Sequence, residues 1–199
     1  VLLAGSLKIG AILAGATAED AENLYKFGMQ IGVAFQLQDD LLDVYGDPEV
    51  FGKKIGGDIL CNKKTYMLIK ALDRADAKQR EELNRWLDAE TCQPAEKIKA
   101  VTELYNQLDI RSVCENKMRG YYTLAMESLA AVGVAEERKK ELLLQANVIS
   151  GHIGISDYLY DDSKAIVFDY DINQTSKQSG YRIIVIDKTG TVINDSNKT

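Results

Sequence analysis

The fold of this chain is decided by residues 35–43, which read FQLQDDLLD. Apolar residues flank this stretch at helical spacing, and the spacing predicts an α-helix over residues 19–45. On such a helix Asp43 lies four positions after Asp39 and three after Asp40, so the three carboxylates share one face. Gln36 lies one turn before Asp40 on the same side. The stretch therefore predicts a helix with an apolar face and a strongly acidic face.

The three carboxylates need a positive partner if their face is even partly buried. Unpaired acids beside an apolar core repel one another and resist the loss of water. A divalent cation that prefers oxygen ligands, such as Mg²⁺ shared with a phosphate group, would remove both problems. Aspartates alone are equally typical of the solvated face of an amphipathic helix, so both interpretations stay open at this point.

Glycines and lysines follow the acidic stretch. Gly46-Asp47-Pro48 indicates a loop, and it is followed by GKKIGGD at residues 52–58 and NKKT at residues 62–65. Glycine lets the backbone approach a ligand closely, and a lysine ammonium supplies a point charge for phosphate oxygens. The GxxxxGK[ST] spacing of a Walker A loop does not occur in the sequence. Together with the acidic helix, these segments predict a site for Mg²⁺ and a polyphosphate.

At these residues the chain resembles the trans-type polyprenyl synthetases, the family of the farnesyl, geranylgeranyl and longer-chain diphosphate synthases. FQLQDDLLDVYGD is similar to the second aspartate-rich motif of the family, FQxxDDxxD, and FGKKIGGDI with NKKT is similar to its two lysine elements. The resemblance covers residues 1 to about 145. It implies that Mg²⁺ on a diphosphate is held by Asp39, Asp40 and Asp43. It also implies that the allylic diphosphate is bound by Gln36, Lys53 and Lys63.

The resemblance implies a prenyltransferase of isoprenoid biosynthesis. In the family an allylic diphosphate ionises to an allylic cation and pyrophosphate, isopentenyl diphosphate attacks the cation, and a proton is lost. Metal ions and lysines stabilise the charge that builds up on the leaving group. The full-length family member is expected to be a homodimer. The earlier DDxxD motif and the isopentenyl diphosphate site of the family do not occur in this sequence. We therefore expect the chain by itself to be an incomplete, inactive fragment.

The composition argues against several partners and compartments. The 199 residues are 46% hydrophobic, which is enough for one sizeable core. A net charge of −6 without a basic stripe argues against nucleic acid as a partner. The three scattered cysteines lack metal-ligand spacing, which favours reduced thiols and a cytoplasmic location. Residues 1–16 are too short for a membrane span and contain Lys8, and they lack the charged start of a signal peptide.

Apolar periodicity predicts a mainly α protein. The expected helices cover residues 1–16, 19–45, 63–75, 77–90, 94–107, 109–131 and 134–146. Gly133 is expected to mark the stop before the last of them. One apolar stripe that is expected to face the core consists of Ile98, Val101, Leu104, Tyr105 and Leu108. Residues 1–146 are expected to form the C-terminal half of a polyprenyl synthetase-like all-α domain, a partial isoprenoid synthase-type helical bundle. From residue 147 the chain is richer in Ile, Val, Tyr, Asp and Ser, which favours a short α+β tail over residues 147–199. Strands are expected at residues 165–170, 181–186 and 191–194, the last two as an antiparallel hairpin that turns at residues 187–190.

Two resemblances compete for this tail. DKTGT at residues 187–191 is similar to the phosphorylation signature of P-type ATPases, but the same residues suit a plain hairpin turn and the large ATPase domains do not follow. SGYRIIVIDKTGTVINDSN, at residues 179–197, resembles the central hairpin of extracytoplasmic PAS-like or Cache sensor regions in bacterial histidine kinases. A prenyltransferase segment and a sensor segment belong to different compartments, so we expect the chain to be a chimera.

Three classes of function therefore stay open. The first is an enzyme of isoprenoid chain elongation, or a fragment of one. The second is a noncatalytic prenyltransferase-like subunit that works in a hetero-oligomer. The third is a signalling sensor fragment, which the tail alone supports. Binding of Mg²⁺ and diphosphate separates the first class from the third, and an aspartate-rich motif upstream in the encoding DNA separates the first from the second.

Overall fold

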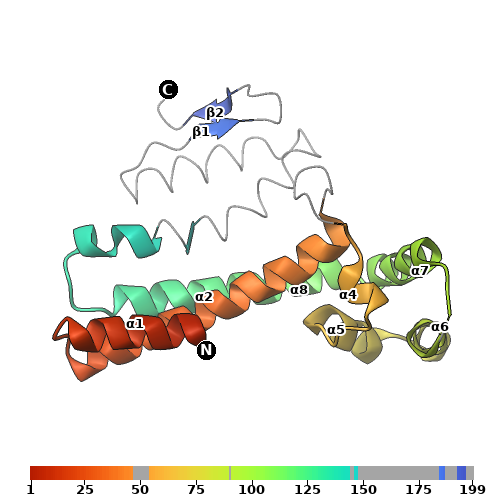
Figure 1. Cartoon of the computed structure of the whole chain (residues 1–199), viewed down its shortest axis with the longest axis horizontal. Coiled ribbons are helices and arrows are strands. Elements are labelled where there is room, and N and C mark those ends of the chain that lie inside the picture. Colours follow the sequence, from red (N-terminus) through yellow and green to blue (C-terminus); the bar gives the residue numbers. More distant parts are fainter. Residues whose placement is uncertain (47–53, 90, 144–145, 148–183, 187–191, 196–199) are drawn as a thin grey trace. The chain divides into compact units, whose positions relative to one another are not determined.

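A computed structural model provides the structure of the chain (Figure 1). It describes residues 1–46, 54–89, 91–143, 146–147, 184–186 and 192–195. The helices in these ranges are α1 Leu2–Leu13, α2 Ala18–Tyr45, α4 Gly57–Leu60, α5 Tyr66–Arg74, α6 Ala77–Asp88, α7 Pro94–Gln107 and α8 Ile110–Ala130. Residues 136–143 are also helical. The mainly α prediction is therefore confirmed for the described residues, although the short helix α4 was not predicted.

By internal contacts, the chain divides into two compact units. Of the described residues, the first unit contains those in 1–34 and from 119 onward, and the second contains those in 35–118. Helices α2 and α8 each contribute residues to both units. The predicted boundary at residue 146 rests on a change in composition and stays a prediction, because residues 148–183 lie outside the described ranges.

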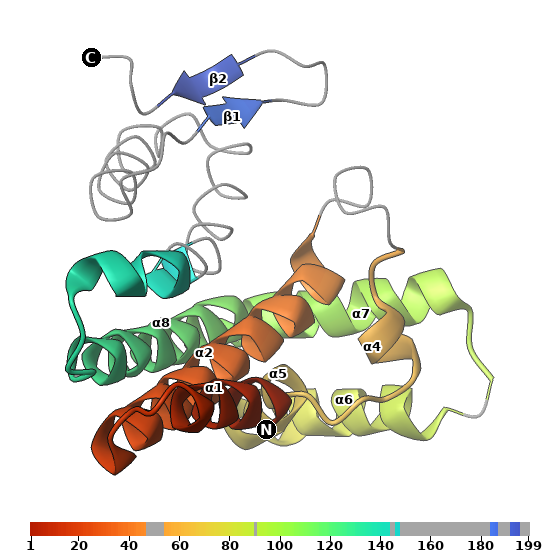
Figure 2. The same ribbon diagram turned by 60° about the vertical axis from the view of Figure 1, so that its left-hand side comes forward.

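In the first unit, α1 lies beside α2 (Figures 1 and 2). The two helices approach so closely that a Cβ atom at Gly28 would lie 2.7 Å from the Cα atom of Ala4. Glycine is the residue that permits this contact, because it has no side chain. The apolar core of the unit is a cluster from three helical segments and the loop after α8: Phe27, Ile31, Ala125, Leu129, Val132 and Ala146.

The start of α2 is fixed by short polar contacts. The backbone N–H of Asp20 donates to the Thr17 hydroxyl at 3.0 Å, as expected for a residue that caps a helix. The Asp20 carboxylate accepts a hydrogen bond of 2.6 Å from the backbone N–H of Gly133, in the loop after α8. Gly133 was predicted to mark the end of the helix before it, and the helical residues of α8 do end at Ala130.

In the second unit, α7 contacts α4, α5 and α6, and α6 runs alongside α7 in Figure 2. Thr65 caps α5 by accepting a hydrogen bond from the backbone N–H of Leu68, and Asp76 forms a capping box with Gln79 at the start of α6. The apolar stripe predicted for α7 is buried at Val101, Leu104 and Tyr105. The sequence periodicity of this helix therefore predicted its core face correctly.

The tail is described only at two short strands. β1, Ile184–Ile186, pairs antiparallel with β2, Val192–Asp195. The expected turn at residues 187–190 and the expected strand at residues 165–170 lie outside the described residues. The complete hairpin and the α+β tail therefore stay predictions. None of the helices in the described part of the chain is long and apolar enough to cross a membrane.

Candidate functional site

Asp40 is the buried acid of the acidic stretch. It lies in α2 with 5% of its surface exposed, whereas Asp39 is exposed and Asp43 is half-buried. Its Oδ1 atom accepts hydrogen bonds from Gln36 Nε2 at 3.1 Å and from Lys63 Nζ at 3.0 Å. A buried carboxylate needs such donors because removal from water disfavours its charge. The structure therefore brings together three of the six predicted site residues.

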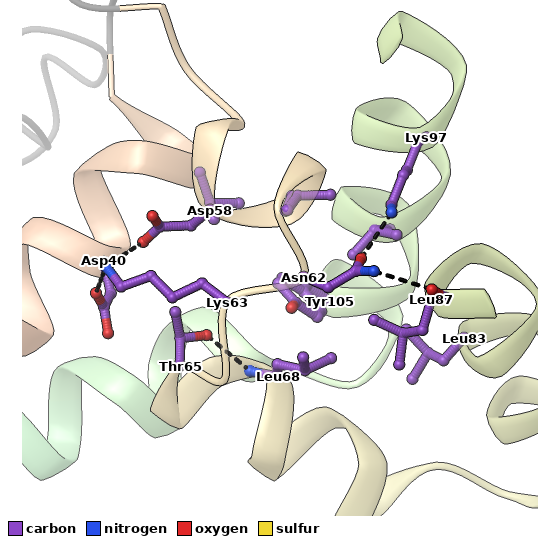
Figure 3. Close-up of a pocket in the computed structure, with 13 residues that line it drawn as sticks. Asp40, Asp58, Asn62, Lys63, Thr65, Leu68, Leu83, Leu87, Lys97 and Tyr105 are labelled. Carbon is purple, nitrogen blue, oxygen red and sulfur yellow. Dashed lines mark hydrogen bonds and ion pairs between the residues drawn. The ribbon is translucent and has the colours of Figure 1, made fainter. Parts of the chain in front are cut away.

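Lys63 joins two acids that lie far apart in the sequence. Its Nζ atom is 3.0 Å from Asp40 Oδ1 and 2.7 Å from Asp58 Oδ2 (Figure 3). The hydrogen bond to Asp58 raises the pKa of the Lys63 ammonium most strongly; desolvation opposes it, and the contacts with Asp40 add to the rise. Lys63 is therefore a firmly held cation between two carboxylates.

Asp43 fixes the short helix that carries Asp58. Its Oδ2 atom accepts a hydrogen bond of 2.8 Å from the backbone N–H of Asp58, and its main-chain oxygen accepts one from Gly56. Gly56 has a φ of 84°, and a Cβ atom there would lie 2.6 Å from two side-chain atoms of Ile98. Glycine alone suits both the left-handed backbone and the close contact. These constraints hold the Asp58 carboxylate where Lys63 reaches it.

Asp40, Asp58 and Lys63 line one side of a pocket in the second unit (Figure 3). Its apolar wall comes mainly from α5, α6 and α7: Leu68, Leu83, Leu87, Val101 and Tyr105. Asn62 and Lys97 add a second polar pair, in which Lys97 Nζ donates to Asn62 Oδ1 at 2.6 Å. The pocket therefore combines fixed charges with an apolar wall.

The predicted site residues differ in their placement. Among the described residues, the pocket is lined by Asp40 and Lys63 and not by Gln36, Asp39 or Asp43. Lys53 lies outside the described residues. Within the described residues, no group of three or more His, Cys, Asp or Glu side chains is arranged to hold a metal ion.

The sequence interpretation gave no role to three residues of this region: Asp58, Asn62 and Lys97. Asp58 ends the GKKIGGD segment, so its place in a glycine and lysine loop was an available signal. Asn62 begins the NKKT segment. Lys97 comes 34 positions after Lys63 in an ordinary amphipathic helix, and no local pattern marks it.

Comparison with solved structures places the fold among the isoprenoid synthase-type helical proteins. A crystal structure of a geranylgeranyl pyrophosphate synthase matches 76% of this chain with a TM-score of 0.69 and 33% sequence identity, over 47% of its own chain. A geranylgeranyl pyrophosphate synthase from Corynebacterium glutamicum, complexed with isoprenyl diphosphate and magnesium, matches 71% with a TM-score of 0.63 and 30% identity, over 40% of its own chain.

The polyprenyl synthetase family profile matches residues 1–105, so this chain belongs to the polyprenyl synthetase family. A (2E,6E)-farnesyl diphosphate synthase of Mycobacterium bovis is 35% identical over 144 residues, which are 71% of this chain and 40% of that protein. A short chain isoprenyl diphosphate synthase of Methanothermobacter thermautotrophicus is 46% identical over 82 residues, 41% of this chain and 25% of that protein. The chain thus spans less than half the length of these relatives.

Proposed function

We propose that this chain serves a prenyltransferase reaction, in which an allylic diphosphate condenses with isopentenyl diphosphate and pyrophosphate is released. The observation that carries the proposal is the Lys63 ammonium shared by Asp40 and Asp58 beside the acidic face of α2. It occurs in a chain of the polyprenyl synthetase family, and the relatives named above are isoprenyl diphosphate synthases. Mg²⁺ on the acidic face and the Lys63 ammonium would together bind a highly charged, oxygen-rich substrate.

In this proposal Asp39, Asp40 and Asp43 would hold Mg²⁺ by turning toward the ion when it binds, because the described structure does not already group them around a metal. The donors are hard carboxylate oxygens on one side of a helix, which is the ligand type that Mg²⁺ prefers. Asp40 and Asp58 already share one cation, the Lys63 ammonium, so this part of the site is built for positive charge. When bound, Mg²⁺ would neutralise the charge that develops on the diphosphate leaving group.

Lys63 would bind the allylic diphosphate directly. An ammonium group has three N–H donors, and Asp40 and Asp58 accept two of them. The third would donate to a phosphate oxygen. Gln36 holds the Asp40 carboxylate through its amide, and we propose it as a further part of the diphosphate site together with Lys53.

Binding of pyrophosphate to the chain tests this proposal. Isothermal titration calorimetry with inorganic pyrophosphate should show binding only when Mg²⁺ is present. The double substitution Asp39→Asn and Asp40→Asn should weaken binding by about 100-fold, because it removes two charged oxygen ligands. Asp88→Asn, which changes an exposed acid of α6, is the matched control and should bind like the parent. Equal affinity of the double variant and the parent would contradict the proposed site.

A noncatalytic prenyltransferase-like subunit would share this binding, so turnover needs a separate assay. Product formation from an allylic diphosphate and labelled isopentenyl diphosphate supports the enzyme, and binding without product supports the subunit. Light scattering of the full-length protein tests the homodimer that we propose for it.

The sensor-like tail and the chimera stay predictions. The family profile ends at residue 105, and β1 and β2 pair as antiparallel strands. A transcript that reads continuously through residues 1–199 would count against a chimera, and two separate transcripts would support it.

A further inference from the structure

Lys97 is a buried cation with no assigned role. It lies in α7 with 3% of its surface exposed, and its ammonium donates to Asn62 Oδ1 at 2.6 Å. A buried ammonium is unfavourable unless it is hydrogen-bonded. An apolar side chain of similar length would suit the neighbouring wall of Leu83, Leu87 and Val101 at least as well. The charge of Lys97 therefore points to a role beyond packing.

Asn62 is held at both ends of its side-chain amide. Its Oδ1 accepts from Lys97, and its Nδ2 donates to the main-chain oxygen of Leu87 at 2.9 Å. Its backbone has a φ of 53°, in the left-handed region that asparagine adopts more readily than most residues. Asn62 thus ties the loop before α5 to α6 and α7 at a point where the chain turns sharply.

Lys63 directly follows this tethered residue. Its backbone N–H donates to the main-chain oxygen of Asp58 at 3.0 Å, and its side chain reaches Asp40 and Asp58 on the opposite side of the pocket (Figure 3). Its direction therefore depends on the conformation of Asn62. We propose that Lys97 is a positioning residue for Lys63 and that it acts through the side chain of Asn62.

The consequence for ligand binding rests on the proposed function, in which Lys63 binds a diphosphate. Loss of the Lys97 ammonium leaves Asn62 Oδ1 without this donor and loosens the turn. The Lys63 side chain then spends part of the time away from Asp40 and Asp58. The diphosphate should bind more weakly, while the core around Lys97 stays packed. Substitution of a residue with a purely structural role would instead lower both the stability of the chain and its affinity for the diphosphate.

Four variants of the whole chain test the proposal. Lys97→Met removes the ammonium and keeps an apolar side chain of similar length. Asn62→Gly keeps the left-handed backbone and removes both side-chain hydrogen bonds. Lys97→Arg restores a cationic donor, and Lys99→Met makes the same chemical change at an exposed position of α7. Each variant is measured by thermal unfolding, by hydrogen–deuterium exchange of residues 58–66, and by calorimetry with Mg²⁺ and inorganic pyrophosphate.

We expect Lys97→Met to unfold at the temperature of the parent or above it, to exchange faster in residues 58–66, and to bind pyrophosphate about ten-fold more weakly. Asn62→Gly should repeat the exchange and binding changes, Lys97→Arg should recover most of the affinity, and Lys99→Met should match the parent. Parent-like exchange and affinity in Lys97→Met would overturn the proposal, as would a lowered unfolding temperature that Lys97→Arg does not restore.

The two proposals fail in different ways. A parent chain that does not bind pyrophosphate with Mg²⁺ contradicts the proposed function. In that case the exchange of residues 58–66 still decides whether Lys97 positions the loop.

Discussion

Gly56→Ala should destabilise the second unit strongly, for two separate reasons. The backbone of Gly56 has a φ of 84°, and a residue with a side chain pays about 1–2 kcal/mol in this left-handed region. The new Cβ atom would also lie 2.6 Å from two side-chain atoms of Ile98, and overpacking of this kind costs about 1–3 kcal/mol. The two terms together predict a loss of about 2–5 kcal/mol in the free energy of unfolding.

Urea denaturation followed by circular dichroism measures this loss. With a slope of about 2 kcal/mol per molar urea, the midpoint should fall by about 1–2.5 M while the slope stays unchanged. The double variant Gly56→Ala with Ile98→Ala keeps the backbone term and removes the steric overlap. Relative to Ile98→Ala alone, the added Gly56→Ala change should therefore cost only about 1–2 kcal/mol.

Gly120→Ala is the matched control. Gly120 lies inside α8, and a Cβ atom there would meet no atom within 4 Å beyond its own helix turn. The same substitution should therefore stabilise the chain by about 0.5–1 kcal/mol. A parent-like urea midpoint for Gly56→Ala would refute the argument, because it would mean that neither the backbone conformation nor the contact with Ile98 exists in solution.

Two further predictions concern titration and thiol chemistry. The hydrogen bond from the Gly133 backbone, and then that from Thr17, lower the pKa of the Asp20 carboxyl below its ordinary value of 3.8. Because this pKa is lower in the folded state than in the unfolded state, the ionised Asp20 carboxylate stabilises the fold above pH 3.8. This stabilisation is lost as the pH falls through the folded-state pKa. The unfolding temperatures of the parent and of Asp20→Asn should therefore converge in acid. A gap between them that stays constant down to about pH 2 would contradict this assignment. Cys61 and Cys92 are exposed and should react with an aromatic disulfide reagent in the native chain. Cys114 should react only after denaturation, because it is buried and burial raises the pKa of its thiol to about 12. If all three thiols of the native chain reacted rapidly with the reagent, the core around Cys114 would have to open, and this prediction would be wrong.

The sequence by itself determined the longer helices and the family. The period of apolar residues is a local property, and it predicted α2 and α7 and the buried face of α7 at Val101, Leu104 and Tyr105. The FQLQDDLLD stretch and the two lysine segments pointed to the polyprenyl synthetases, and the family match over residues 1–105 confirmed this membership. Both signals depend on spacing within a few turns of chain, which a sequence displays directly.

Only the tertiary structure decided which polar groups meet. The sequence placed Asp39 and Asp40 as equal members of one acidic face, but packing buries Asp40 and leaves Asp39 exposed. Asp58 reaches Lys63 because Gly56 takes a left-handed turn, a backbone choice that residue spacing does not encode. Lys97 meets Asn62 because α7 packs against α4, which brings together positions 35 residues apart. Such contacts depend on how helices cross and how loops turn, since the partner of a polar atom is set by distance in space and not by distance along the chain.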